Sequence, residues 1–543
     1  MGTKADIPEV DYEKKSSRCC TSTRSCILLV IFGTVGIISG AVVMDIVYDK
    51  ILEVIVYDMM HLTPSSMIYP EWAEPSIPLT SKFYFWEVTN PDEVFNGGKP
   101  ALIEKGPYAY DLFLRRDNIS NNDNGTISSI PVYTYVFNRE KSIGPDTDRF
   151  LGVNMPMTST AYMMRDAPRF IRESMSVVLE ELNETMFIDL SVADLLWGYD
   201  EPLFKMIHDL FPIEGVDEQF GFLLGYNGTD MNGLFTVYDG KDDVSMLNRI
   251  DNWKGKTTVD FWFTDEANMM NGTDGMMWHP FIKKDENVLD LFHPDFCRTM
   301  PYVYEEDETF KGIPMRRYAL APYAYANGTT YPPNEGFCKD DTCAPNGIQR
   351  MDPCRFGSPM GMSNPHFLYA DPSLSEQIIG LNPDEEKHKN YFLLEPYMGM
   401  PYVMRQRLQI NMFLRDVQGI KQMGDVRTMY IPAIWFAQEV DVPDNVIKSY
   451  ELGFQVTALI VEIMKYIMIV GGALMVLAGT TITIVKYYRR TQANQYLNEK
   501  EPLLDNKPHP HKKTSKRKQP PSASTRKFKS IAQSETSEAS ELD

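Results

Sequence analysis

Seven cysteines in a chain of 543 residues are too few for a small disulfide-stabilised scaffold. Basic residues are also scarce, because 53 Lys and Arg stand against 74 Asp and Glu and give a net charge of -21. Proteins that bind nucleic acid through its phosphates usually carry excess positive charge, so nucleic acid is disfavoured as a partner. Only two long hydrophobic runs occur, which excludes a polytopic membrane protein. The hydrophobic content of 43% is ordinary for a globular protein and excludes wholesale disorder.

The two hydrophobic runs, at residues 26–44 and 466–485, contain no charged residue. At about 1.5 Å per residue each run covers roughly 28–30 Å, the thickness of the hydrocarbon core of a bilayer. The alternatives are a buried core helix and, for the first run, a cleaved signal peptide. That run is long for a signal peptide and lacks a clear small-x-small cleavage site before Asp45. We therefore expect transmembrane helices at residues 26–48 and 458–485.

Basic residues lie on the terminal side of each run and set its expected orientation, because cytosolic flanks are enriched in Lys and Arg. They are Lys14, Lys15, Arg18 and Arg24 before the first run, and Lys486, Arg489 and Arg490 after the second. The pattern predicts a cytosolic tail at 1–25, a luminal or extracellular domain at 49–457, and a disordered basic cytosolic tail at 486–543.

Six Asn-x-Ser/Thr sequons all fall between the two runs, where glycan attachment is possible. Their asparagines are Asn118, Asn124, Asn183, Asn227, Asn271 and Asn327. The same segment holds Cys297, Cys338, Cys343 and Cys354, an even number in an oxidising compartment. Four cysteines allow three disulfide pairings, and a zinc site fits the C-x4-C spacing poorly.

Much of this segment has the alternation and the β-branched and aromatic content of strands. Such stretches lie at 82–88, 132–137, 235–238, 407–415 and 430–436. Helical spacing is found from Pro168 to Phe187, and Ser191 is placed to cap a further helix that carries Leu195 and Leu196. The fold class is therefore mainly β with helical insertions, with a helical cluster at about 155–212.

Several motifs resemble those of the class B scavenger receptor family, which includes the lysosomal integral membrane protein type. They lie at 99–110 (KPALIEKGPYAY), 195–202 (LLWGYDEP), 235–256, 270–275, 296–298, 311–314, 365–372 and 380–383. They occur in the family's order, and the resemblance runs from about residue 26 to residue 485.

The resemblance implies a large antiparallel β-barrel with an apical helical bundle, held by two membrane helices. In this family the bundle binds ligands or protein partners, and an apolar tunnel carries sterols, fatty acids or other lipids toward the membrane. By position, the cluster at 155–212 matches the bundle. Family positions also favour the pairings Cys297–Cys354 and Cys338–Cys343.

One departure from the family pattern concerns a third disulfide. Ala267 stands where vertebrate receptors have a cysteine, and Phe337-Cys338 offers one cysteine where those receptors often offer two. Both halves of one bridge are missing together. This resembles the lysosomal integral membrane protein branch and weakens a direct transfer of the plasma-membrane lipoprotein role.

No catalytic or metal motif stands out, so we expect neither enzyme activity nor a metal or cofactor. The sequence contains no Gly-x-Ser-x-Gly elbow, P-loop or GxGxxG. Six histidines are scattered between the runs without metal-ligand spacing, and we interpret them as ordinary surface or core residues. They are His61, His208, His279, His293, His366 and His388.

Arg165, Arg169 and Arg172 recur at 3–4 spacing and are candidates for contacts with anionic ligands on the apical helix. The alternative is a solvated helix face that pairs with nearby glutamates. The glutamates in question are Glu173, Glu180 and Glu181.

The cytosolic segments carry two candidate signals. Cys19, Cys20 and Cys26 are candidates for palmitoylation, with free thiols as the alternative. Glu499 stands four residues before the pair Leu503-Leu504, which resembles an endolysosomal sorting signal read by adaptors. The alternative is that two leucines in a polar tail are incidental.

Three functions remain as hypotheses. The first is a membrane glycoprotein receptor, at the plasma membrane or in endolysosomes, that binds lipids (sterol, fatty acid or phospholipid) or lipoproteins and passes lipid to the membrane. The second is a trafficking receptor that carries a luminal protein to lysosomes. The third, a membrane-anchored hydrolase, has no motif in its favour.

Overall fold

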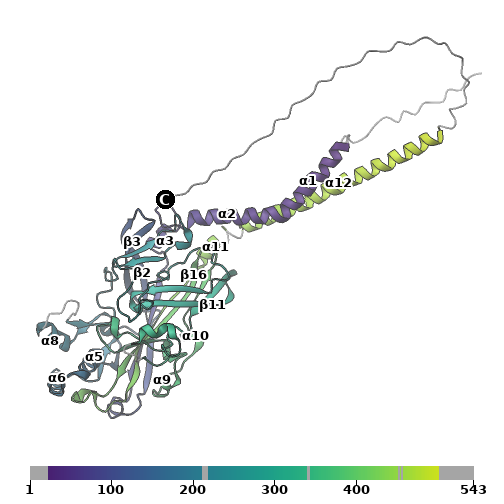
Figure 1. The fold of residues 1–543 in the computed structure, drawn as a ribbon. Helices are drawn as coiled ribbons and strands as arrows, with labels where there is room; N and C mark the ends of the chain where they lie inside the picture. Colours follow the sequence, from purple (N-terminus) through teal and green to yellow (C-terminus); the bar gives the residue numbers. More distant parts are fainter. Residues whose placement is uncertain (1–22, 211–217, 339–342, 451–452, 454–455, 501–543) are drawn as a thin grey trace, which may run out of the picture. The chain divides into compact units, whose positions relative to one another are not determined.

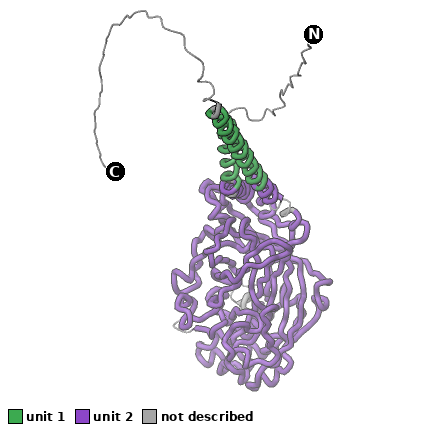
Figure 2. Tube along the Cα trace, turned by 90° about the vertical axis from the view of Figure 1, so that its right-hand side faces the viewer, with its two compact units in different colours: residues 1–40, 466–543 green, residues 41–465 purple. Residues whose placement is uncertain are grey.

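The computed structural model describes residues 23–210, 218–338, 343–450, 453 and 456–500. The chain divides into two compact units (Figure 2). One contains residues 1–40 and 466–543, and the other contains residues 41–465. The predicted ectodomain, 49–457, lies within the second unit.

Two helices in the described part of the chain are long and apolar enough to cross a membrane, judged by length and composition alone. They are Arg24–Val42, with a mean hydropathy of 2.3, and Val456–Tyr496, with a mean hydropathy of 2.1. The first belongs to α1 (Thr23–Ile38), which is followed by the π-helical turn η1 (Ser39–Val43) and α2 (Met44–Met59). The second belongs to α12 (Val456–Lys500). These helices fit the two-pass topology expected from the sequence.

Within the first unit, α1 and α12 approach each other at glycines. A Cβ added to Gly33 would lie 2.6 Å from the carbonyl oxygen of Gly472, and a Cβ added to Gly472 would lie 2.5 Å from that of Gly33. Because glycine has no side chain, the two helix backbones can approach closely here. Such close approach increases the van der Waals contact between helices in a membrane.

The second unit is built on one antiparallel sheet of 13 strands. Its main path runs β10-β11-β12-β15-β16-β17-β1-β2-β3-β8-β9, and β13 and β14 join it beside β16. The strands are β1 (Leu79–Val88), β2 (Leu102–Asn121), β3 (Thr126–Asn138), β8 (Phe235–Tyr238), β9 (Ile250–Trp253), β10 (Val288–His293), β11 (Arg298–Phe310), β12 (Ile313–Leu320), β13 (Gln349–Arg350), β14 (Met360–Ser363), β15 (Tyr391–Glu395), β16 (Met400–Leu414) and β17 (Met429–Asp441).

The five stretches expected to be strands are confirmed, in β1, β3, β8, β16 and β17. Burial alternates along β1, where Phe83 and Phe85 are buried and Lys82 and Tyr84 are half-buried. This alternation follows from the pleat, which points successive side chains to opposite faces. Burial of large aromatic side chains against the sheet supplies the main favourable term of folding.

Closure of the sheet into a barrel is not confirmed, because β9 and β10 do not pair with each other in the described structure. The segment after Asn271 connects these two edges instead. The carbonyl of Gly272 accepts a hydrogen bond from the amide of Ile250 on β9, and Thr273 forms a parallel bridge with Leu291 on β10. A Cβ on Gly272 would lie 2.0 Å from the Asp290 carbonyl oxygen, so only glycine allows this approach.

The helical cluster lies beside one end of the sheet, where Figure 1 shows α5, α6 and α8 close together. It consists of α5 (Met155–Met163), the 3₁₀ turn η2 (Met164–Asp166), α6 (Arg169–Glu181), α7 (Val192–Trp197) and α8 (Pro202–Leu210). Short strands β4 (Arg149–Val153) and β5 (Phe187–Ser191) pair within it, as do β6 (Tyr199–Asp200) and β7 (Gln219–Phe220). The expected helical cluster is therefore present, although its role as an apical bundle is not tested by the fold.

Two local expectations had different outcomes. Ser191 caps α7 as expected: its hydroxyl accepts a hydrogen bond from the amide of Asp194, and the Asp194 carboxylate accepts one from the amide of Ser191. The helix expected from Pro168 to Phe187 is shorter and ends at Glu181. Asn183 then adopts a left-handed conformation, with φ of 56°, and turns the chain toward β5.

The remaining helices are short and lie in connections. They are α3 (Tyr69–Ala73), α4 (Pro91–Phe95), η3 (Val244–Met246), η4 (Pro294–Phe296), η5 (Pro332–Phe337), η6 (Asp352–Cys354), η7 (Pro365–Phe367), α9 (Pro372–Glu376), α10 (Glu385–His388), η8 (Lys421–Met423) and α11 (Asp444–Tyr450).

Candidate functional site

An open groove of about 560 Å³ runs along the base of the helical cluster. Its size is typical of sites for small or extended apolar ligands. Its apolar lining comes from α4, β4 and β5, and its polar rim comes from the end of α6 and from η8. The lining residues are Pro91, Asp92, Phe95, Leu151, Glu180, Glu184, Thr185, Met186, Phe187, Lys421 and Gln422.

The three arginines proposed as ligand contacts do not share one helix face. Arg165 precedes α6, and its guanidinium lies 4.0 Å from the ring centroid of Tyr162. Arg172 donates a hydrogen bond to the backbone carbonyl of Arg165, at 2.7 Å. Arg169 is exposed, and its Nε lies 2.8 Å from a carboxylate oxygen of Glu173. Of the three arginines, only Arg169 is exposed. Its contact with Glu173 agrees with the alternative interpretation, in which these arginines pair with nearby glutamates on a solvated helix face.

A cluster that the sequence did not indicate joins Glu104 on β2 with two buried histidines. Nε2 of His366 lies 2.6 Å from a carboxylate oxygen of Glu104, and the Trp435 indole donates to the same oxygen at 2.9 Å. The ring of His388 stacks on that of His366, with 4.1 Å between centroids. No sequence spacing could reveal this cluster, because 262 positions separate Glu104 from His366.

The ligand-type atoms of Glu104, His366 and His388 all lie within 4.8 Å of one another, which invites comparison with a metal site. The hydrogen bonds favour another arrangement. Nδ1 of His366 accepts from the amide of Asn382 at 3.0 Å, and Nδ1 of His388 accepts from the amide of Asp384 at 2.9 Å. Each Nδ1 therefore lacks a proton, so each neutral ring carries its hydrogen on Nε2, the atom that a metal would need. The geometry suits hydrogen bonding to Glu104 better than metal ligation.

The pKa values of His388 and Glu104 in this cluster are both lowered. Burial, followed by the neighbouring His366, lowers the pKa of His388 to about 4. Burial opposes ionisation of Glu104, but hydrogen bonds from His366 and Trp435 outweigh it and lower the pKa of that carboxyl. His388 therefore stays neutral above about pH 4, and Glu104 ionises more readily than an ordinary glutamate, which suits a structural role in both neutral and acidic compartments.

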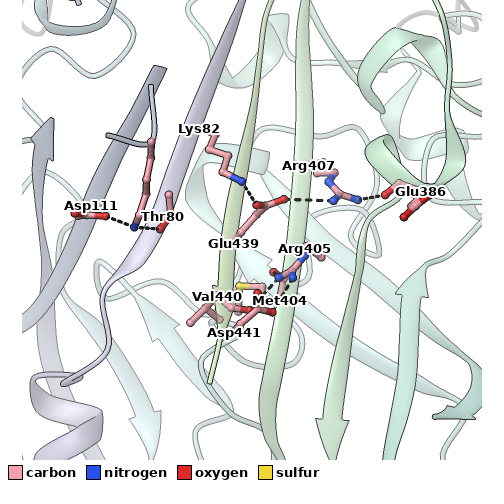
Figure 3. Close-up of polar contacts among 11 residues, drawn as sticks. Thr80, Lys82, Asp111, Glu386, Met404, Arg405, Arg407, Glu439, Val440 and Asp441 are labelled. Atoms are coloured by element: carbon pink, nitrogen blue, oxygen red, sulfur yellow. Dashed lines mark hydrogen bonds and ion pairs between the residues drawn. The ribbon is translucent and has the colours of Figure 1, made fainter. Parts of the chain in front are cut away.

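A row of paired charges crosses three adjacent strands of the sheet, β1, β17 and β16 (Figure 3). Lys82 on β1 lies 2.5 Å from Glu439 on β17, and Glu439 lies 3.3 Å from Arg407 on β16. Arg407 also donates to the backbone carbonyl of Glu386 at 3.0 Å. Because these charges satisfy one another across strands, we interpret the row as a device that fixes strand register.

Two disulfides lie in the second unit and join Cys297 to Cys354 and Cys338 to Cys343. The first holds the start of β11 against η6. Beside it, the buried Arg298 donates to Gln349 Oε1 at 2.7 Å and lies 3.6 Å from the ring centroid of Phe337. Ala267, where the resemblance led us to expect a cysteine in vertebrate receptors, is buried.

The sequon asparagines differ in exposure. Asn118, Asn124, Asn183 and Asn227 are exposed, whereas Asn271 and Asn327 are half-buried. Exposure of the first four makes them the more accessible glycan acceptors.

The cytosolic candidates are only partly within the described residues. Cys26 is buried in the first unit, with its thiol 3.6 Å from the amino group of Lys486. This burial disfavours acylation of Cys26. Cys19, Cys20, Leu503, Leu504 and the side chain of Glu499 lie outside the described residues.

A model of the CD36 family matches residues 27–483, which include the sheet, the helical cluster and nearly all of both hydrophobic runs. The chain belongs to the CD36 family. This assignment confirms the resemblance read from the motifs.

Two groups of CD36-family relatives are similar to the chain over most of its length. Scavenger receptor class B member 1 of Sus scrofa is 34% identical over 471 residues, which cover 86% of this chain and 90% of that protein. Lysosome membrane protein 2 of Homo sapiens is 32% identical over 457 residues, which cover 84% of this chain and 93% of that protein. The names of these relatives describe a receptor and a membrane protein. One relative is thus a scavenger receptor and the other belongs to the lysosomal membrane.

Proposed function

We propose that this chain is a two-pass membrane receptor that binds lipid or lipoprotein ligands and passes lipid to the bilayer without covalent chemistry or a cofactor. The observation that carries the proposal is the similarity to scavenger receptor class B member 1 over 86% of the chain. Sterols, fatty acids and phospholipids are the proposed lipid classes.

The groove at the base of the helical cluster is the proposed site where lipid first contacts the ectodomain. Its lining includes Phe95, Leu151, Met186 and Phe187, which together offer an apolar surface. Transfer of a lipid chain from water onto such a surface is favourable by about 25 cal/mol per Å² of apolar area buried. In this proposal the helical cluster is the apical bundle, Arg169 contacts anionic head groups, and lipid continues through the interior of a barrel-like sheet to the membrane.

Leu151→Glu is expected to reduce lipid uptake by about tenfold at subsaturating ligand. Leu151 is half-buried on β4 in the groove lining. A carboxylate there removes apolar contact worth roughly 1.5 kcal/mol and places a charge against the lipid chain, and about 1.4 kcal/mol corresponds to a tenfold change in affinity. The measurement is uptake of a fluorescent cholesteryl ester from lipoprotein particles by cells that express the chain.

Leu151→Met is the matched control, because it keeps the volume and the apolar surface, and it should take up lipid like the wild type. Uptake is divided by the surface amount of each variant, so that a folding defect is not read as a binding defect. Equal normalised uptake by the glutamate variant would remove the groove from the lipid route.

A second function, transport of a luminal protein to lysosomes, is supported by the similarity to lysosome membrane protein 2. The pair of disulfides and the tail sequence around Leu503-Leu504 point the same way. In this proposal sorting adaptors bind Glu499, Leu503 and Leu504, and the two juxtamembrane cysteines Cys19 and Cys20 carry palmitate. The six sequon asparagines remain proposed glycan sites.

A further inference from the structure

Two buried carboxyl groups meet at the centre of the helical cluster. Glu201, at the start of α8, is 0% exposed, and Glu184, between α6 and β5, is 6% exposed. Glu184 and the hydroxyl of Tyr199 are the side chains that act on the carboxyl of Glu201, and its Oε2 atom is buried without a hydrogen-bond partner among the described residues. Two acidic side chains in contact and out of water are rarely found without a cation or a proton between them.

The pair connects three helices of the cluster. Asn154 caps α5, since its side-chain oxygen accepts from the amide of Met157 at 3.0 Å. Its side-chain amide donates to Glu184 at 2.7 Å. On the other side, Glu201 accepts from the amide of Leu203 in the first turn of α8. The start of α5, the connection that follows α6 and the start of α8 therefore converge on these two carboxyl groups.

No cation neutralises the pair among the described side chains. The groups that act on Glu201 are Glu184, Tyr199 and the amide of Leu203. Arg172 of α6 donates to the backbone of Arg165 instead. The other charged groups that the structure describes on the surrounding elements are exposed or half-buried, namely Arg149 on β4, Arg169, Glu173, Glu180 and Glu181 on α6, Asp189 on β5, Asp194 on α7, Asp200 on β6, Lys205 on α8 and Glu218 beside β7.

Two ionised carboxylates would repel each other at this site. A proton shared between them would remove this repulsion, because a protonated acid can donate to a carboxylate. Burial, followed by the charge of Glu184, raises the pKa of Glu201 to about 7. The proton is therefore bound in acidic surroundings and is lost across the range between an endolysosomal lumen and the cell surface.

We infer that Glu201 and Glu184 form a proton-binding site that locks α5, α6 and α8 together in acidic surroundings and loosens them in neutral surroundings. Glu184 also lines the groove, so the same proton would set the shape of that groove. The inference does not rest on the proposed lipid-binding function, because the proton site would act in the same way with any ligand of the helical cluster.

The direction of the pH dependence follows from proton binding in the two states. The unfolded carboxyl titrates near its ordinary value of 4.5, whereas the folded one titrates near 7. Between these values the folded cluster holds a proton that the unfolded chain does not. The stabilisation is therefore fully present below about pH 4.5 and is lost as the pH rises through about 7.

Hydrogen exchange of the full chain in nanodiscs at pH 5 and pH 8 tests the inference. After correction for the intrinsic pH dependence of exchange, protection of residues 155–206 should fall by about 50-fold from pH 5 to pH 8 in the wild type. Glu201→Gln is expected to abolish this fall, because the amide is neutral at both pH values and can donate to Glu184. Glu181→Gln, an exposed position at the end of α6 that does not line the groove, is the control and should keep the wild-type fall.

Two results would overturn the inference. One is wild-type protection in the helical cluster that does not change with pH. The other is a Glu201→Gln variant that folds and keeps the full fall. If Glu201→Gln does not fold, Glu184→Gln takes its place, since either amide removes the second negative charge. A full fall in Glu184→Gln would likewise overturn the inference.

Discussion

Cys297→Ser combined with Cys354→Ser is expected to leave little folded protein at its membrane destination. The bridge closes a sequence separation of 57 residues, and on the chain-entropy model its loss costs about 4 kcal/mol. Such a loss is a large fraction of the total free energy of unfolding of a typical domain. Cys297 is also buried, and its carbonyl accepts a hydrogen bond from the Trp262 indole at 2.7 Å. The measurement is the fraction of protein that acquires mature glycans in cells.

The second bridge provides a matched comparison. Cys338–Cys343 spans a sequence separation of only 5, so the same model gives about 2 kcal/mol for its loss. Cys338→Ser with Cys343→Ser should therefore reduce mature protein much less. Equal maturation of both double variants and the wild type would contradict the stabilising role assigned to the long bridge.

Leu503→Ala combined with Leu504→Ala is expected to raise the surface fraction severalfold and to deplete endolysosomes. An adaptor can bind a dileucine segment only where the chain is exposed and unfolded, and the composition of the tail predicts both. Surface biotinylation of the wild type and the double variant measures the change. Glu499→Ala should have a smaller effect in the same direction.

The control for this experiment is Lys512→Ala with Lys513→Ala, which changes the same tail beyond the proposed signal. It should leave the distribution unchanged. If the wild type is already mostly at the surface and the leucine variant matches it, the lysosomal role is removed and the lipid-receptor role remains.

The strands and the capped helix could be predicted because their signals are local. The alternation in β16 and the Ser191 cap depend on residues a few positions apart, where side-chain periodicity and capping chemistry act directly. The membrane helices could be predicted for the same reason, since their signal is a continuous apolar run. The end of α6 could not, because the turn at Asn183 depends on how the chain enters β5.

The buried polar clusters could not be predicted, because long-range pairing creates them. His366 and His388 looked like ordinary histidines until the sheet placed Glu104 beside them. Glu184 and Glu201 could not be distinguished among 74 acidic residues, since only the packing of α5, α6 and α8 removes them from water. The motif at 99–110 pointed to the family but gave no reason for Glu104, whose role depends on β17 and η7.

Lipid transfer by the purified full chain in proteoliposomes tests the central claim most directly. Donor lipoprotein particles carry a fluorescent cholesteryl ester, and acceptor vesicles of phosphatidylcholine contain the chain, the Leu151→Glu variant or no protein. The account predicts transfer well above the protein-free rate for the wild type and close to that rate for the variant. Wild-type transfer no faster than that into protein-free vesicles would contradict it.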